Sequence, residues 1–217
     1  MAMKLLVPTC AAILMLHAAS GCTNLLVTPG ASAEGTSSIS YMADTGALFG
    51  TLGHYPPTNE FSRTTYDWDS GAYLGVIPGF TENGTRKETY NVIANTNEHG
   101  LSIGETTFGG NATLAGGPGL LSYGSVIWVT LQRAKTAREA ITVMDQLMQA
   151  YGYTSDGESF SVADPNEVWI MEVVGKGPQT KGSVWVAKRI PDGYVSAHAN
   201  QARIRAPLVT DDPTTCR

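Results

Sequence analysis

The chain has 217 residues, with 19 acidic against 14 basic side chains and a formal net charge of −5. It lacks the clustered lysines and arginines that neutralise phosphates, so we expect no nucleic-acid partner. Its length is that of one globular domain. Beyond the N-terminal leader the sequence holds no second long apolar segment, and we therefore expect no membrane span.

Residues 1–21 are typical of an export leader. Lys4 precedes an apolar stretch, and the small residues Ala18-Ala19-Ser20-Gly21 follow it. Signal peptidase requires small side chains at the third and first positions before its cut, which here are Ala19 and Gly21. We therefore expect a signal or propeptide over 1–21, removed by signal peptidase or by self-cleavage, and a mature domain over 22–217. This predicts a secreted, periplasmic or lysosome-like location.

Such a cut makes Cys22 the first residue of the mature chain. Its thiol would be a nucleophile, and its freed α-amine, which titrates near 7.7–8.0, would accept the proton. A second hypothesis is a lipid-anchored binding protein acylated at Cys22, although Ala19 stands where lipoproteins usually carry leucine and no polar tether follows. A third is an inert, buried cysteine. A bridge from Cys22 to Cys216 would consume the nucleophile.

Strand and turn patterns dominate the rest of the chain. Residues 47–78, rich in aromatic residues, glycine and proline, indicate a long connection or lid, and 109–119 indicate a glycine-rich surface loop. The turn residues at 164–166 predict a hairpin between the strands on either side. The expected strands are 24–28, 38–43, 92–94, 101–107, 125–131, 160–163, 168–173, 183–188 and 194–197.

One helix is clearly indicated. Thr136 and Glu139 form a capping box, and Gly152 supplies a C-terminal stop. Its predicted apolar face has helical spacing and consists of Ile141, Met144, Leu147 and Met148. Strands outnumber helices and their pairings look antiparallel, so the predicted class is α+β, with a helix covering one face of a sheet.

Several stretches resemble the cysteine-type N-terminal-nucleophile (Ntn) dipeptidases, the PepD-like family, which is distantly similar to penicillin V acylase and bile salt hydrolase. They run across nearly the whole mature chain. They are CTNLLVT at 22–28, NEHGL at 97–101, IGETT at 103–107, LQRAKTAREA at 131–140, GESF at 157–160, ADPNEVW at 163–169 and AHANQAR at 197–203.

The resemblance implies a four-layer αββα Ntn-hydrolase sandwich that hydrolyses the amide bond of dipeptides or small peptides without a cofactor. The related alternative is an amidase for acylated amino acids. The histidines share no metal-like spacing, so we expect no metal site. Family members are longer than this chain, which implies that 22–217 is the N-terminal part of a longer domain, truncated at its C-terminus.

The resemblance also implies residue roles. Cys22 matches the nucleophile, Asp44 the residue that positions the α-amine, and Asn200 the residue that stabilises the oxyanion. Thr107 matches a second, variable oxyanion or pocket position. Tyr41 stands where the acylase relatives carry an arginine that favours the thiolate, so it offers only a hydrogen bond.

The residues by themselves leave other interpretations open. Asp44 and Asn200 are also ordinary turn residues, and Thr107 is an ordinary strand residue. His198 is an alternative base for a cysteine–histidine pair.

The remaining polar groups have more ordinary interpretations. Asn97 is expected to form a structural turn, and Glu158 and Glu172 are expected to be strand-edge or solvent carboxylates rather than an acid/base pair. The aromatic stretch 55–68 is expected to contribute to substrate preference.

Overall fold

The computed structural model describes residues 21–44, 52–205 and 215–216. The leader predicted over 1–21 therefore lies outside the described residues except for Gly21. Within the described ranges, no helix has both the length and the apolar character needed to cross a membrane.

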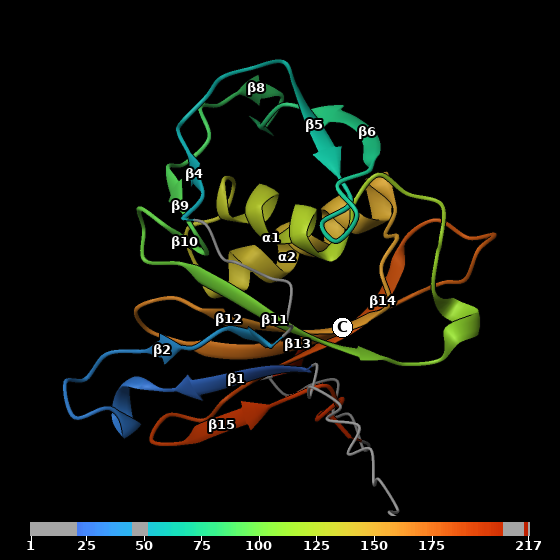
Figure 1. Cartoon of the computed structure of the whole chain (residues 1–217). Coiled ribbons are helices and arrows are strands. Elements are labelled where there is room, and N and C mark those ends of the chain that lie inside the picture. Colours follow the sequence, from blue (N-terminus) through green and yellow to red (C-terminus); the bar gives the residue numbers. More distant parts are fainter. Residues whose placement is uncertain (1–20, 45–51, 206–214, 217) are drawn as a thin grey trace, which may run out of the picture.

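The larger of two principal sheets is antiparallel and has the strand order β16-β14-β13-β12-β11-β10-β9-β4 (Figure 1). Its centre is a meander of long strands that pair along most of their length. The central strands are β11 (Ser102–Gly109), β12 (Gly157–Ala163), β13 (Val168–Gly175) and β14 (Ser183–Arg189). The short outer strands are β4 (His54–Tyr55), β9 (Val92–Ile93), β10 (Thr96–Asn97) and β16 (Thr215–Cys216).

The smaller sheet lies against the larger one and is built around β1 (Gly21–Val27). One side of β1 pairs with β15 (Val195–His198), and β2 (Ser38–Ile39) and β3 (Met42–Asp44) also pair with it. Strand β1 packs on β11 of the larger sheet. The two principal sheets therefore form two stacked layers, as Figure 1 shows.

Helices α1 (Tyr123–Leu131) and α2 (Ala137–Tyr151) cover the face of the larger sheet that is turned away from β1 (Figure 1). The main apolar core fills the space between these helices and the sheet. A smaller core of Leu26, Ala163, Val168 and Ile170 joins the two sheets. Short 3₁₀ turns occur at Pro29–Ala31 and Ala112–Leu114.

The predicted helix is confirmed as α2. The Thr136 hydroxyl accepts a hydrogen bond from the Glu139 amide at 3.2 Å, as a capping box requires. The Glu139 carboxylate reaches back to the amide of Lys135 instead of that of Thr136. Gly152 follows the last helical residue with a φ of +82°, a left-handed value that favours glycine.

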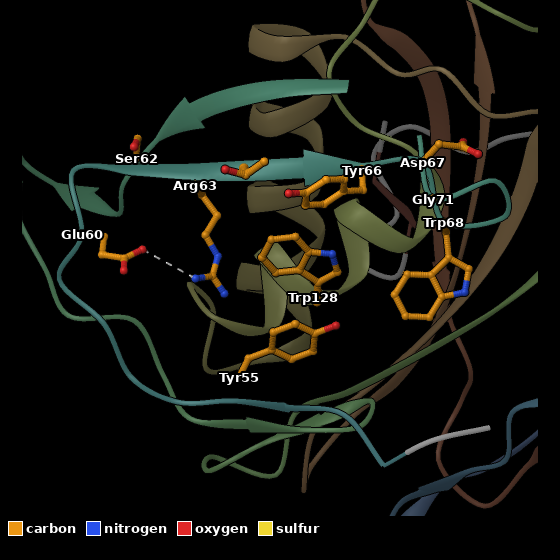
Figure 2. Close-up of a pocket in the computed structure, with 10 residues that line it drawn as sticks. Tyr55, Glu60, Ser62, Arg63, Tyr66, Asp67, Trp68, Gly71 and Trp128 are labelled. Atoms are coloured by element: carbon orange, nitrogen blue, oxygen red, sulfur yellow. Dashed lines mark ion pairs between the residues drawn. The ribbon is translucent and has the colours of Figure 1, made fainter. Parts of the chain in front are cut away.

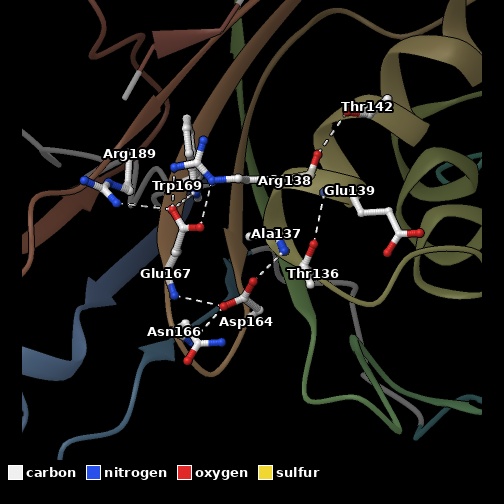
Figure 3. Close-up of polar contacts among 10 residues, drawn as sticks. All are labelled: Thr136, Ala137, Arg138, Glu139, Thr142, Asp164, Asn166, Glu167, Trp169 and Arg189. Carbon is white, nitrogen blue, oxygen red and sulfur yellow. Dashed lines mark hydrogen bonds and ion pairs between the residues drawn. The ribbon is translucent and has the colours of Figure 1, made fainter. Parts of the chain in front are cut away.

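The predicted hairpin between β12 and β13 is also confirmed, and Asp164 ties its turn to α2 (Figure 3). The buried Asp164 carboxylate accepts hydrogen bonds from the amides of Asn166 and Glu167 within the turn. It also accepts one from Ala137, the first residue of α2, at 2.8 Å. The Arg138 side chain binds the Glu167 carboxylate at 2.8 Å, so helix and hairpin are held in register.

The strand predicted over 125–131 is wrong, because this segment forms α1. Eight of the nine residues of α1 are buried. A helix buried on nearly all sides lacks a polar stripe, and a short apolar run rich in valine and isoleucine has no periodicity that separates helix from strand. The shortness of this apolar run and its β-branched residues favoured a strand over the helix that the structure has.

The connection predicted over 47–78 contains regular structure in its described part. It supplies β4 and a hairpin of β5 (Ser62–Tyr66) and β6 (Tyr73–Pro78), which lies above α1 in Figure 1. A second small hairpin follows, formed by β7 (Thr81–Glu82) and β8 (Thr85–Arg86). The strand predicted over 38–43 is divided between β2 and β3.

The fold class is α+β, dominated by antiparallel sheets. Among the described residues the layers are helices, large sheet and small sheet, in that order. This arrangement places the start of β1, where Cys22 lies, against β11 of the large sheet.

Candidate active site

Cys22 is the second residue of β1 and is half-buried, with a free thiol. In the antiparallel pairing with β3, Cys22 lies opposite Ala43 and Gly21 lies opposite Asp44. The Asp44 backbone is thus beside the residue that precedes Cys22, while the Asp44 side chain is exposed. The sheet brings these two predicted site residues together in space.

Asn200 links Cys22 to β11. Its Oδ1 atom accepts a hydrogen bond from the Cys22 amide at 2.7 Å, and its Nδ2 atom donates one to the Thr107 carbonyl at 2.6 Å. Because one end of the amide accepts and the other donates, both bonds fix the orientation of the side chain. A Cβ atom on Gly21 would lie 3.0 Å from Asn200 Oδ1, so the small residue before Cys22 leaves room for this contact.

The surroundings of the Cys22 thiol favour its neutral form. Burial is the main cause that raises the pKa of Cys22, and the neighbouring carboxyl groups of Glu105 and Glu158 raise it further. Hydrogen bonds from the Thr107 backbone and the Asn200 side chain act in the opposite direction. The net effect is a raised pKa, so the thiol needs a proton acceptor before it can attack.

Tyr41 makes a hydrogen bond, but its partner is a carboxylate that the sequence did not single out. The Tyr41 hydroxyl donates to Glu105 Oε1 at 2.6 Å. The bond is possible because Gly104 has no side chain: a Cβ there would lie 2.9 Å from the Cβ of Tyr41. Burial and Glu105 raise the pKa of Tyr41, so its phenol stays protonated.

The prediction that Glu158 and Glu172 are solvent or strand-edge carboxylates is wrong. Glu158 is 1 % exposed and Glu172 is 6 % exposed, since β12 and β13 lie inside the large sheet with a layer on each face. Glu158 accepts a hydrogen bond from the Thr107 hydroxyl at 3.0 Å. Glu172 accepts from the backbone amides of Arg203 and Ile204, so it holds the segment that follows Asn200.

His198 is buried, and its two ring nitrogens are occupied away from Cys22. Nδ1 lies 2.7 Å from the Thr106 hydroxyl, and Nε2 lies 2.7 Å from the Ser161 hydroxyl. Burial, with a smaller effect of Arg203, lowers the pKa of His198 to about 4. These contacts give His198 a structural role between the two sheets and do not favour it as the base for Cys22.

Asn97 has the structural role that the sequence predicted. Its side chain donates to the carbonyls of Leu131 and Ala134, both at 2.8 Å. Its Oδ1 atom accepts from the amides of His99 and Leu101 in the tight turn before β11. This buried amide joins the turn to the C-terminal end of α1.

The aromatic segment over 55–68 lines a cavity of about 570 Å³ (Figure 2). Arg63 lies over the Trp128 ring, 4.8 Å from its centre, and Tyr55 stacks on Trp128 with a centroid distance of 5.3 Å. Tyr55, Trp68 and Trp128 also line a narrow second cavity that reaches Tyr41. The aromatic walls of the larger cavity therefore continue toward the tyrosine that binds Glu105.

Two functional candidates, Glu105 and the buried Glu158, were missed by sequence reasoning. The available signal for Glu105 was a carboxylate within the strand predicted over 101–107, immediately after a glycine. Its partner Tyr41 is 64 residues away in the chain, so no local pattern reveals the contact.

Comparison with known proteins identifies the family of the chain. The model of peptidase family C69 matches residues 21–216. A probable dipeptidase of Latilactobacillus sakei is 28% identical over 197 residues, covering 85% of this chain and 40% of the relative. A dipeptidase of Bifidobacterium longum is 35% identical over 88 residues, covering 40% of this chain and 15% of the relative.

A third relative is a probable dipeptidase of Salmonella dublin, which is 33% identical over 112 residues. That match covers 49% of this chain and 24% of the relative. The chain therefore spans less than half the length of these relatives. The family match, in contrast, extends over all the described residues and includes Cys22, Thr107 and Asn200. The chain belongs to peptidase family C69, a family of cysteine peptidases.

Proposed function

We propose that this protein is a cysteine dipeptidase whose nucleophile is Cys22, acting as the first residue of the mature chain. The observation that carries the proposal is the pair of hydrogen bonds through which Asn200 holds both the Cys22 amide and the Thr107 carbonyl. Membership of peptidase family C69 and the dipeptidase names of the relatives support the same reaction class.

In the proposed reaction, the Cys22 thiol attacks the carbonyl carbon of the first residue of a dipeptide. The thiol proton passes to the freed α-amine of Cys22 and then to the leaving amine of the second residue. The C–N bond breaks and a thioester remains on Cys22. Water then attacks the thioester, which releases the first amino acid and restores the thiol.

Asn200 is proposed to stabilise the oxyanion. In the structure its Nδ2 atom donates one hydrogen to the Thr107 carbonyl, close to Cys22, and the second hydrogen of this amide is the donor proposed for the developing negative charge. Thr107 is proposed as the second group at this position, and Asp44 is proposed to hold the α-amine. The position of Asp44 opposite Gly21, next to the bond that must be cut, supports its role.

Residues 1–21 are proposed to be a leader whose removal frees the Cys22 amine and directs the protein to a secreted or periplasmic location. Gly21 and Cys22 both lie in β1, paired with β3. The half-buried position of Cys22 in β1 supports a nucleophile more than a lipid attachment point, because no tether separates Cys22 from the folded sheet.

We further propose that the described layers are part of an αββα sandwich, within the Ntn-hydrolase domain over 22–217. The helices, large sheet and small sheet agree with three of its four layers. This chain covers only 40% and 24% of two of the relatives, which supports a family domain longer than 22–217.

The test has two measurements, the identity of the mature N-terminus and the substrate preference. The sample is purified from its natural or a secreting host, its N-terminus is determined by mass spectrometry, and turnover is measured on dipeptides and on N-acylated amino acids. We expect the active fraction to begin at a free, unmodified Cys22 and to hydrolyse dipeptides. A lipid-modified Cys22, or hydrolysis confined to N-acylated amino acids, would contradict the proposal.

A further inference from the structure

Two buried carboxyl groups lie side by side next to the candidate active site. Glu105 of β11 is 2 % exposed and Glu158 of β12 is 1 % exposed. Glu158 is the cross-strand partner of Thr107, and Glu105 lies two residues before Thr107 on the same strand. Side chains two residues apart on a strand share one face, so all three groups lie on the same side of the large sheet.

Each carboxyl group has one oxygen with a hydrogen-bond donor and one without. Glu105 Oε1 accepts from Tyr41 at 2.6 Å, and Glu158 Oε1 accepts from Thr107 at 3.0 Å. The Oε2 atoms of both groups are buried and meet no donor among the described residues. Two ionised carboxylates would leave both of these oxygens unsatisfied in a site without solvent, which is costly.

A single proton shared between the two carboxyl groups gives both Oε2 atoms a hydrogen-bond partner. If one carboxyl group is protonated, its hydroxyl donates to the other, and a carboxylic acid–carboxylate hydrogen bond forms. Burial, together with the hydrogen bond and the charge of Glu105, raises the pKa of Glu158 to about 10. Glu158 is therefore the member that carries the proton at neutral pH, and the pair as a whole keeps one negative charge.

Among the described residues, no ion pair joins either carboxyl group to a lysine, arginine or histidine. The neighbours that interact electrostatically with the pair are Tyr41, Tyr123 of α1, Tyr153, Asp156 and Cys22 of β1. All of these are phenols, a thiol or a carboxylate. The buried titratable groups on the other described strands are His198, held by Thr106 and Ser161, and Glu172, held by backbone amides.

We propose that Glu105 and Glu158 form a proton-sharing carboxyl pair that positions Thr107 and keeps exactly one negative charge beside the Cys22 thiol. Thr107 connects the two sites, because its hydroxyl binds Glu158 and its backbone interacts with both Asn200 and Cys22. The single charge opposes thiolate formation, so Cys22 remains a neutral thiol at neutral pH until a base takes its proton. Glu105 and Glu158 are positioning residues in this scheme. The proposal deepens the proposed function, but it is tested through the thiol and does not require turnover.

The experiment measures the rate of Cys22 alkylation by iodoacetamide against pH, with the modified peptide quantified by mass spectrometry. Glu158→Gln keeps an oxygen for Thr107 and donates its amide to Glu105. Glu105→Gln keeps an oxygen for Tyr41 and donates to an ionised Glu158. Each single variant retains one negative charge, whereas the double variant Glu105→Gln/Glu158→Gln retains none.

We expect the midpoint of the alkylation profile to fall by about one pH unit in the double variant, because a nearby like charge has been removed. At a pH below the midpoint, this corresponds to alkylation about tenfold faster. Each single variant should move the midpoint by less than a third of that shift. Asp164→Asn, a change at a buried carboxylate in the β12–β13 turn, is the matched control and should leave the midpoint unchanged.

Two results would overturn the proposal. A full shift in Glu158→Gln alone would mean that Glu158 is ionised in the native protein, and an unshifted double variant would mean that the pair does not act on the thiol. A measurement on the wild-type protein tests the proposal even if the variants fail to fold. In ¹³C-carboxyl-labelled glutamate spectra, one buried glutamate should stay protonated above neutral pH, and titration of every glutamate below neutrality would also overturn the proposal.

Discussion

Asn200 Oδ1 lies 2.7 Å from the backbone nitrogen of Cys22, although 178 residues separate the two in the chain. The contact exists because β15, which ends two residues before Asn200, is the antiparallel neighbour of β1. The position of the candidate nucleophile is thus fixed by a strand pair formed between the beginning and the end of the described domain. The first prediction concerns this contact.

Asn200→Ala should reduce kcat for dipeptides by about 10²–10³, the loss found when one oxyanion donor is removed from an enzyme. It removes the acceptor for the Cys22 amide and the donor for the Thr107 carbonyl, while the substrate pocket is left in place. Steady-state kinetics of the variant provide the measurement. Gln201→Ala, a change at the exposed neighbouring residue, is the control, and equal losses in both variants would show that the segment matters only for folding.

Stability should depend on pH through His198. Its pKa is lowered to about 4, mainly by burial, whereas histidine in an unfolded chain titrates near 6.5. Between these values the unfolded chain binds a proton that the folded protein does not. The free energy of unfolding is therefore lost as the pH falls from 6.5 toward 4, by up to about 1.4 kcal/mol per pH unit.

Urea unfolding across this pH range, for the wild type and His198→Gln, measures the effect. The glutamine cannot titrate, so the variant should show a flatter dependence on pH even if it is less stable throughout. Parallel curves for the two proteins would show that His198 is not the group responsible.

Asp164→Ala should lower the free energy of unfolding by at least about 2 kcal/mol. The buried carboxylate accepts from the amides of Ala137, Asn166 and Glu167, and alanine leaves these donors without a partner. Asp164→Asn keeps an acceptor oxygen and should lose less. Urea denaturation measures both variants, and a loss within about 0.5 kcal/mol for alanine would show that water replaces the carboxylate.

The elements that local patterns specify were predicted well. The capping box and the spacing of Ile141, Met144 and Met148 predicted α2, and the turn residues from Asp164 onward predicted the β12–β13 hairpin. In both cases the determining residues lie within one element or one turn. The strand predicted over 125–131 failed because α1 is enclosed by the sheet and the β5–β6 hairpin, and an enclosed helix shows no polar stripe.

The candidate site could be predicted from the sequence only in part. Resemblance to a family identified Cys22 and Asn200, and the structure brings them into contact. Glu105 and Glu158 were not predicted as site groups, because a glutamate in a strand pattern looks solvent-facing unless its layer is known to be covered. Their partners come from another strand or from a distant segment, and only the stacked sheets and helices bring the groups together.

The central claim is that Cys22 is the nucleophile of dipeptide hydrolysis, and turnover by a chain that begins at Cys22 tests it most directly. We predict that Cys22→Ala and Cys22→Ser reduce kcat/KM on the order of 10⁴-fold or more, because both remove the thiol on which the acyl intermediate forms. Cys216→Ser, at the other cysteine within 22–217, should retain the wild-type rate. Wild-type turnover in Cys22→Ala would contradict the account.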